Sequence, residues 1–319
     1  MALDDDLIHG GSAERPALRR WRTRLAHFGF TGWLGLAVIV FWAAAAIFGP
    51  ALLSQSGDAG GGEVFAPISA AHWFGTDYLG RDMLARVVEG ARYTVGVAFF
   101  ATLLASGSGT LLALLAAASG RWIDGTLSRV LDTLTAIPSK MFALLIVAGF
   151  GSSILVLVVT AAVIYLPGAY RMARALAVNV NALDYVTVAR ARGEGTGYVM
   201  LQEILPNITG PMLADFGLRF VYVVLLLASL SFLGLGIQPP EADWGSLVRE
   251  NIETLAKAVP PVIAPSIAIA SLTIAVNLVI DNLPGRTARE RGGNADLGSL
   301  VVVDKPASPL PATPRWSTR

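Results

Sequence analysis

The chain has 319 residues, of which 54% are hydrophobic and only 15% are charged, whereas about 25% of the residues of a typical soluble domain are charged. Its 24 Lys and Arg nearly balance its 23 Asp and Glu, which excludes a nucleic-acid binder that relies on a strong positive field. The apolar content excludes a disordered chain. The absence of cysteine excludes disulfides, thiolate chemistry and Cys-ligated metal sites.

Long runs without a charged residue predict the class of protein. Each of five runs reaches the roughly 20 apolar residues that a helix needs to cross the hydrocarbon core of a bilayer. Buried strands of soluble proteins are shorter, about 4–8 residues. Membrane β-barrels alternate apolar and polar residues, and this chain does not. We therefore expect an all-α integral membrane protein.

The third run is too long for one crossing, and a turn-like cluster at 149–153 divides it into two helices. The first run is too long for the apolar region of a cleaved signal peptide, about 7–15 residues, and predicts a retained helix. We therefore expect six transmembrane helices, over 30–52, 93–118, 135–150, 153–175, 213–237 and 260–281. An N-terminal segment, a first helix with its loop, a five-helix core and a disordered tail then occupy 1–29, 30–92, 93–284 and 285–319.

The distribution of positive charge predicts the orientation of these helices. With six crossings both termini share one side of the membrane, together with 119–134 and 171–212. These segments hold 17 of the 24 Lys and Arg, and the two segments on the other side hold five. Because Lys and Arg accumulate in cytoplasmic loops, we expect both termini in the cytoplasm. We expect Lys140 and Arg219, near helix boundaries, to extend towards the interface.

The long cytoplasmic loop contains a predicted helix–turn–helix over 184–206. Gly193 can turn the chain with a positive φ, and a second short helix at about 196–204 would end at Pro206. The spacing of three and four residues places one set of side chains on one face of the first helix: Tyr185, Val188, Ala189 and Arg192. This segment is either a docking knob for a soluble subunit or an ordinary helical connection, and spacing alone leaves both open.

The same loop resembles the coupling loop of ABC importer permeases, whose pattern is Glu-Ala-Ala, three residues, Gly, and later Leu-Pro. Thr187-Val188-Ala189 stands where Glu-Ala-Ala would be, so two of these three letters depart from the pattern, while Gly193 and Leu205-Pro206 fall at the expected spacing. The resemblance implies that this loop docks on an ATPase subunit. The implied coupling residues are Tyr185, Thr187, Val188, Ala189, Arg192, Gly193, Leu205 and Pro206.

Two further segments resemble the second, "C"-type permease of dipeptide, oligopeptide and nickel importers, and this resemblance covers about 70–285. The first is an extracytoplasmic motif with His72, Gly75, Thr76, Asp77, Gly80, Arg81 and Asp82. The second is a helix-end motif with Ser231, Gly234, Gly236, Pro239, Trp244 and Gly245.

The chemistry of these two motifs leaves alternatives open. Asp77 can cap a short helix, and Arg81 can pair with Asp77 or Asp82. A metal site built from His72 and the two aspartates is possible, but a structured elbow is favoured. In the second motif, small residues suit close helix packing and the prolines would end the fifth helix. The motif either forms a gate against the partner permease or serves only to pack helices together.

The resemblance implies a type I ABC importer permease that forms half of a translocation pore for peptides or a related small solute. Its implied partners are a homologous second permease, two ATPase subunits and an extracytoplasmic solute-binding protein, in the inner membrane of a bacterium. No Gly-Lys pair occurs, so the chain lacks a phosphate-binding loop, and ATP hydrolysis is expected in the partners. We expect no catalytic, cofactor or metal site.

Two alternatives come from other classes of protein. A secondary transporter would show inverted repeats and ionisable groups at the membrane midplane. An intramembrane enzyme would need converging polar residues within the helices. The sequence shows neither feature by inspection, and the helix interiors offer few fixed polar groups.

Overall fold

The computed structural model describes residues 29–57, 62–256 and 260–283, and the expected cytoplasmic N-terminal segment and disordered tail lie almost wholly outside them. The described residues are almost entirely helical, with one isolated β-bridge between Thr76 and Asp82. The first half contains α2 (Phe30–Gly57), α3 (Met83–Ser119), α4 (Arg121–Leu134), α5 (Ser139–Phe150) and α6 (Ile154–Asn181). The second half contains α7 (Asp184–Ala191), α8 (Thr196–Tyr198), the π-helix η1 (Val199–Ile204), α9 (Leu205–Phe232), α10 (Trp244–Glu250), the 3-10 helix η2 (Ile252–Ala256) and α11 (Pro260–Asp281).

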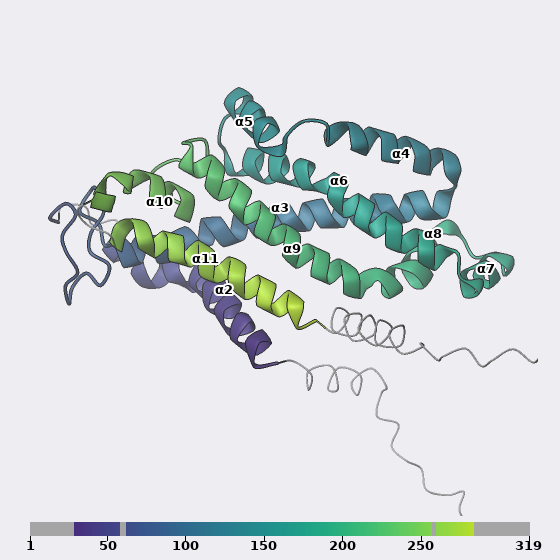
Figure 1. The fold of residues 1–319 in the computed structure, drawn as a ribbon, viewed down its shortest axis with the longest axis horizontal. Coiled ribbons are helices and arrows are strands. Elements are labelled where there is room, and N and C mark those ends of the chain that lie inside the picture. Colours follow the sequence, from purple (N-terminus) through teal and green to yellow (C-terminus); the bar gives the residue numbers. More distant parts are fainter. Residues whose placement is uncertain (1–28, 58–61, 257–259, 284–319) are drawn as a thin grey trace, which may run out of the picture.

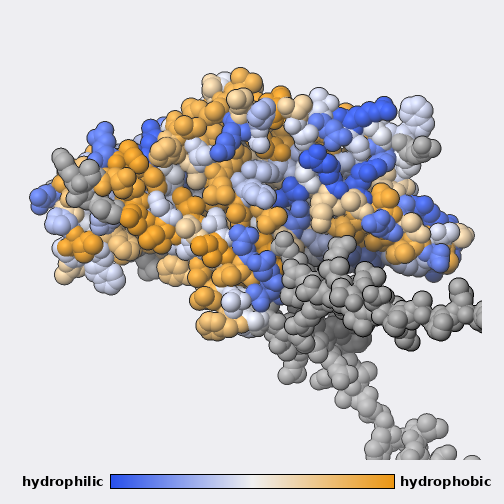
Figure 2. All heavy atoms as spheres, viewed as in Figure 1, coloured by the Kyte–Doolittle hydropathy of each residue, from blue (hydrophilic) through white to orange (hydrophobic). Residues whose placement is uncertain are grey.

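The long helices form an elongated bundle, with α10 at one end and α7 and α8 at the other (Figure 1). Figure 2 shows apolar side chains over much of the middle of this bundle and hydrophilic ones gathered towards its ends. Among the described residues, five helices are long and apolar enough to cross a membrane, and the α4–α5 pair adds a sixth if it is counted as one span. The expected all-α membrane class is therefore confirmed.

The helices pack through small residues. The buried positions of α3 and α6 include many alanines, such as Ala98, Ala101 and Ala105 on α3 and Ala161 and Ala173 on α6. Small side chains let two helix backbones approach closely, which favours dispersion contacts where lipid removes the hydrophobic driving force.

Several expected boundaries differ from the observed ones; the expected spans 153–175 and 213–237 are observed as α6 (Ile154–Asn181) and α9 (Leu205–Phe232). Helix α3 begins at Met83 rather than at residue 93, because Asp82 caps it by accepting a hydrogen bond from the Ala85 N–H. The expected 135–150 span is α5, whose 12 residues cover only about 18 Å. The expected loop at 119–134 is largely the helix α4, which meets α5 at an angle of 78°.

The ends of the described chain lie side by side. The Gly29 N–H donates to the Asn282 side-chain oxygen at 3.1 Å, and the Asn282 amide nitrogen donates to the Thr31 hydroxyl at 3.1 Å. The beginning of α2 and the end of α11 therefore lie together at one level of the bundle (Figure 1).

The α3–α6 contact yields a stability prediction. A Cβ on Gly109 would lie 2.7 Å from the Ala169 Cβ and 2.9 Å from the Tyr170 backbone nitrogen. We expect Gly109→Ala to lower the free energy of unfolding by about 1–3 kcal/mol, because α3 and α6 must separate. Thermal unfolding in detergent measures this. Gly107→Ala, with nothing within 4 Å, is the control, and equal midpoints for the two variants would contradict the close approach.

Candidate functional site

The predicted helix–turn–helix is present at the α7 end of the bundle. The predicted positive φ of Gly193 is confirmed at 86°, and this turn leads from α7 towards α8. Tyr185 and Val188 are 40% and 56% exposed, and Thr187 and Arg192 are exposed as well. A short helix with exposed apolar side chains therefore projects from this end.

One member of the expected exposed face lies on the other side of α7. Ala189 and Val186, three residues apart, are fully buried, because this side of the helix packs on the rest of the chain. Among the expected contact residues on α7, Tyr185, Thr187 and Val188 are therefore exposed and Ala189 is not.

The expected helix end at Pro206 is wrong. Helix α8, the π-helix η1 and α9 follow one another without a break, and Pro206 is the second residue of α9. The helical stretch continues through Pro206 with one backbone hydrogen bond fewer, because proline has no N–H. Leu205 is the first residue of α9. The Asn207 amide nitrogen, in the first turn of α9, donates to the Tyr185 hydroxyl at 3.1 Å, so α7 is tied back to α9.

The extracytoplasmic motif folds into a compact elbow at the α10 end. The fully buried Asp77 carboxylate accepts from the Arg81 N–H at 2.9 Å and from the Arg81 Nε at 2.7 Å. Of the two expected partners, Arg81 therefore pairs with Asp77. The helix cap is Asp82 rather than Asp77, and the other Asp82 carboxylate oxygen lies 3.1 Å from the His72 Nδ1.

The remaining residues of this motif shape the backbone of the elbow. Gly75 and Gly80 have φ of 70° and 74°, a conformation that favours glycine. The Thr76 hydroxyl donates to the Glu63 carbonyl at 2.6 Å and accepts from the Ala66 N–H at 2.7 Å. These contacts hold the preceding loop against the start of α3.

Helix α9 ends in a Schellman motif rather than at prolines. Gly234 has φ of 85°, the Leu235 N–H donates to the Leu230 carbonyl, and the Gly234 N–H donates to the Ser231 carbonyl. The cis-linked Pro239 and Pro240 lie several residues beyond the helix end.

Two glycines of the helix-end motif let the following segment fold back onto α9. A Cβ on Gly236 would lie 1.7 Å from the Ser231 hydroxyl oxygen, and one on Gly245 would lie 2.5 Å from the Ala228 carbonyl oxygen. No side chain fits in either place, which explains why both positions carry glycine.

Asp243 joins α9 to α10 through a buried carboxylate. It caps α10 by accepting from the Ser246 N–H at 2.7 Å, and the Ser246 hydroxyl completes a capping box. The Ser231 hydroxyl of α9 donates to its other oxygen. Burial raises the pKa of Asp243 above its usual range. Burial also raises the pKa of Glu250 at the end of α10, against the opposing charge of Arg86.

The next residue, Trp244, joins α10 to α3 and α2. It is fully buried, its backbone N–H donates to the Thr94 hydroxyl at 3.0 Å, and its indole N–H donates to the Val87 carbonyl at 2.8 Å. Its ring meets that of Trp42 edge to face, with centroids 4.7 Å apart. We call Thr94, Ser231, Asp243 and Trp244 the Trp244 cluster.

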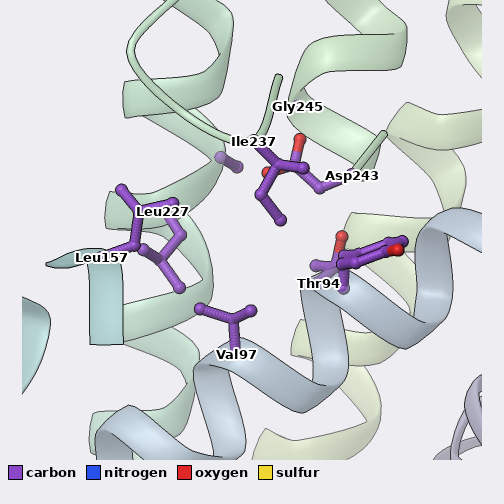
Figure 3. Close-up of a pocket in the computed structure, with 9 residues that line it drawn as sticks. Thr94, Val97, Leu157, Leu227, Ile237, Asp243 and Gly245 are labelled. Carbon is purple, nitrogen blue, oxygen red and sulfur yellow. The ribbon is translucent and has the colours of Figure 1, made fainter. Parts of the chain in front are cut away.

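The helix that follows the first motif therefore contacts the second motif although about 150 residues separate them. Arg86, one turn after the capping Asp82, donates to the Pro240 carbonyl at 3.3 Å and to Glu89 at 3.0 Å. A cavity of about 10 Å³, with space for one water, lies between α3, α6 and α9 and has Thr94 and Asp243 in its wall (Figure 3). Neither Arg86 nor Thr94 belongs to a local motif, so no sequence signal indicated these two residues.

A buried ion pair lies between the two ends. Arg219, on α9, is only 8% exposed and pairs with Asp215 one turn earlier. The expectation that it extends to the interface is therefore wrong, because the carboxylate and the backbone of α6 hold its guanidinium inside the bundle. The spacing of four residues between the two charges is the sequence signal that could have indicated this pair.

Residues 109–289 match the family described as binding-protein-dependent transport system inner membrane component. The chain is 35% identical over 251 residues to the dipeptide transport system permease protein DppC of Alkalihalophilus pseudofirmus, an alignment that covers 78% of this chain and 83% of that one. It is also 35% identical over 215 residues to the glutathione transport system permease protein GsiD of Pectobacterium atrosepticum, covering 67% and 71% of the two chains. The crystal structure of an amino acid ABC transporter with histidines aligns with a TM-score of 0.47 at 18% identity, over 66% of this chain and 94% of that one.

The buried carboxyl of Asp243 makes stability depend on pH. Because its pKa is raised in the folded chain, the folded state binds a proton more tightly than the unfolded state, whose aspartate pKa is about 3.9. This contribution to stability is fully present below the unfolded pKa and is lost as pH rises through the folded pKa. The native thermal midpoint should therefore rise relative to that of Asp243→Asn as pH is lowered from about 7 to about 5.

The Asp243→Asn variant isolates this carboxyl, because its side-chain oxygen still accepts from the Ser246 N–H while Glu250 is present in both proteins. Thermal unfolding of both proteins across this pH range measures the difference. A constant difference between the two midpoints would contradict a titrating Asp243.

Proposed function

Since this chain belongs to the family of binding-protein-dependent transport system inner membrane components, we propose that it is the permease subunit of an ATP-driven importer for peptides or a related small solute. Relatives named for dipeptide, di/tripeptide and glutathione transport support the choice of cargo. In this proposal the chain forms half of the translocation pore and hydrolyses no ATP, in keeping with its lack of a phosphate-binding loop.

The observation that carries the proposal is the exposed face of α7. Tyr185 and Val188 expose apolar surface at the tip of the bundle. Exposed apolar surface of this kind is typical of a contact with another protein. The helix lies between the end of α6 and the continuous stretch from α8 to α9. A displacement of α7 therefore acts on α6 and α9 together.

We propose that residues 184–206 form the coupling loop, with Tyr185, Thr187, Val188 and Arg192 as the contact surface for an ATPase subunit. Gly193 then shapes the turn, and Ala189 anchors α7 from inside. Leu205 and Pro206 begin the helix that receives the movement.

The positive charge of the chain supports the orientation. The α7 end faces the cytoplasm in this proposal, because the loop that carries α7 belongs to the set of segments rich in Lys and Arg. The α10 end, with the elbow at 72–82, then faces outward. Residues 1–29 and 285–319 are proposed to lie in the cytoplasm, and the protein belongs to the inner membrane of a bacterium.

The proposed partners are a homologous second permease, two ATPase subunits and an extracytoplasmic solute-binding protein. ATP binding closes the ATPase pair and moves α7, and the long helices carry the movement to the α10 end, which alternately opens outward and inward. The Trp244 cluster holds the outer ends of α3, α9 and α10 together during this movement.

A mild-detergent pull-down of the tagged chain from its native host tests the proposal. Recovery of a second permease and ATPase subunits, identified by mass spectrometry, is the expected result. Recovery of the chain alone, repeated after cross-linking and joined to uptake that needs no ATP, would favour the alternative of a secondary transporter.

The coupling loop yields a specific prediction. Gly193 has a φ of 86°, and proline fixes φ near −65°, so Gly193→Pro must rebuild the turn after α7. We expect ATP-driven uptake to fall by at least about tenfold, because an uncoupled loop loses on the order of 1.4 kcal/mol or more of coupling free energy. Membrane insertion should be unchanged.

Gly151→Pro is the matched control for this variant. Gly151 has almost the same φ, 85°, and equally open surroundings, but it lies between α5 and α6. Normal uptake with Gly193→Pro, or an equal loss with both variants, would contradict a special role for the 184–206 loop.

A further inference from the structure

A buried polar contact joins α6 and α9 midway along the bundle. The Arg219 Nε and Nη2 donate to the two carboxylate oxygens of Asp215 at 2.6 and 3.0 Å, and the Nη1 donates to the Tyr165 carbonyl of α6 at 3.1 Å. A Cβ on Gly168 of α6 would lie 2.6 Å from that Nη1, so the guanidinium rests directly on the α6 backbone. We call Asp215, Arg219, Tyr165 and Gly168 the Arg219 clamp.

The charged groups of the clamp bond to partners within the protein. All three guanidinium nitrogens of Arg219 have protein partners, and both Asp215 oxygens accept from them. The side chains of Arg219 and Asp215 are only 10% and 13% exposed. A substrate carboxylate would have to enter this buried space beside Asp215 to reach the arginine, so the geometry favours a positioning role over ligand binding.

The clamp lies beside a proline inside α6. Pro167 has no N–H, so α6 lacks one backbone hydrogen bond there although the helix continues over Ile154–Asn181. Arg219 bonds to the residue two positions before this proline and rests on the residue directly after it. The Tyr165 hydroxyl also donates to the Tyr222 carbonyl of α9 at 3.0 Å. Two hydrogen bonds therefore join α9 to α6 just before the proline, and the guanidinium contacts α6 just after it.

The two clamped helices are the ones that flank α7. The chain leaves α6 at Asn181, passes through α7, and returns through η1 into α9, so α6 and α9 form a hairpin with α7 at its tip (Figure 1). The far end of α9 carries Ser231, which bonds to Asp243 in the Trp244 cluster. A stiff hairpin would transmit a displacement of α7 to this far end, whereas a hairpin that bends at Pro167 would absorb it.

We propose that the Arg219 clamp is a positioning device that makes α6 and α9 move as one body, so that movement of α7 reaches the Trp244 cluster. This inference rests on the proposed function, since it names how the coupling loop acts on the pore. Arg219 acts through the geometry of the two helices and touches no substrate.

The first test weakens the clamp without changing any charge. Gly168→Ala pushes the guanidinium off α6, and Gly107→Ala on α3, with nothing within 4 Å, is the matched control. In the complex purified with its native partners, we expect Gly168→Ala to retain the ATPase subunits while ATP-driven uptake falls at least about fivefold. Gly107→Ala should transport as the native chain does.

A second variant separates the polar link from helix packing. Asp215→Leu combined with Arg219→Leu leaves no buried charge unpaired, and such apolar replacements are often tolerated, but it removes the bond to Tyr165. We expect an assembled complex with the same loss of uptake as Gly168→Ala. Native uptake by this assembled double variant would overturn the proposal.

The movement itself can be measured because the chain has no cysteine. Spin labels on Val178→Cys of α6 and Leu213→Cys of α9, both at exposed positions, report the distance between the two helices on the α7 side of the clamp. We expect this distance to be the same with and without ATP in the native background and to change with ATP in the Gly168→Ala background. A change with ATP in the native background would overturn the rigid hairpin.

These outcomes are distinct from a failure of the proposed function. A native complex that lacks ATPase subunits or ATP-driven uptake would overturn the importer proposal, and the role of the clamp with it. An active native complex with fully active clamp variants would overturn the clamp alone.

Discussion

The architecture of the α10 end depends on Trp244. Its two N–H groups bond to α3 and its ring contacts Trp42 of α2, while Asp243 beside it bonds to α9 and caps α10. One dipeptide therefore satisfies the polar groups at the start of α10 and joins four helices, in a place where an unmade hydrogen bond costs about 1–3 kcal/mol. Gly236 and Gly245 have no Cβ that would clash with α9, so this dipeptide can lie close to that helix.

From this fixed point, α9 runs the length of the bundle to the α7 end (Figure 1). The proposed importer uses this continuity, because a docking helix at one end is useful only if its displacement reaches the other. The Arg219 clamp stiffens the path at the level of Pro167 in α6. The Trp244 cluster, the clamp and α7 thus lie one after another along the pair formed by α6 and α9.

The sequence predicts the class of protein and most helices well, since apolar runs of this length have few other stable structures in a bilayer. It predicts the positive φ of Gly193 and limits the partner of Arg81 to Asp77 or Asp82, because both depend on nearby residues. It places the start of α3 ten residues late, because Arg86 and Glu89 interrupt the apolar run although they lie in the same helix. It misses α4, whose polar residues suggest a loop, and it cannot place Arg219 against Tyr165, because that contact joins two distant helices.

For α7 to meet an ATPase subunit while the elbow faces outward, the Trp244 cluster and α7 must lie at opposite faces of the membrane. Single cysteines in the cysteine-free chain, at the exposed Trp73 beside the elbow and at the exposed Val188 on α7, test it most directly with a membrane-impermeant maleimide. Trp73→Cys should be labelled in intact spheroplasts, and Val188→Cys only after the membrane is permeabilised. Labelling of both from outside, or the reverse pattern, would contradict the account.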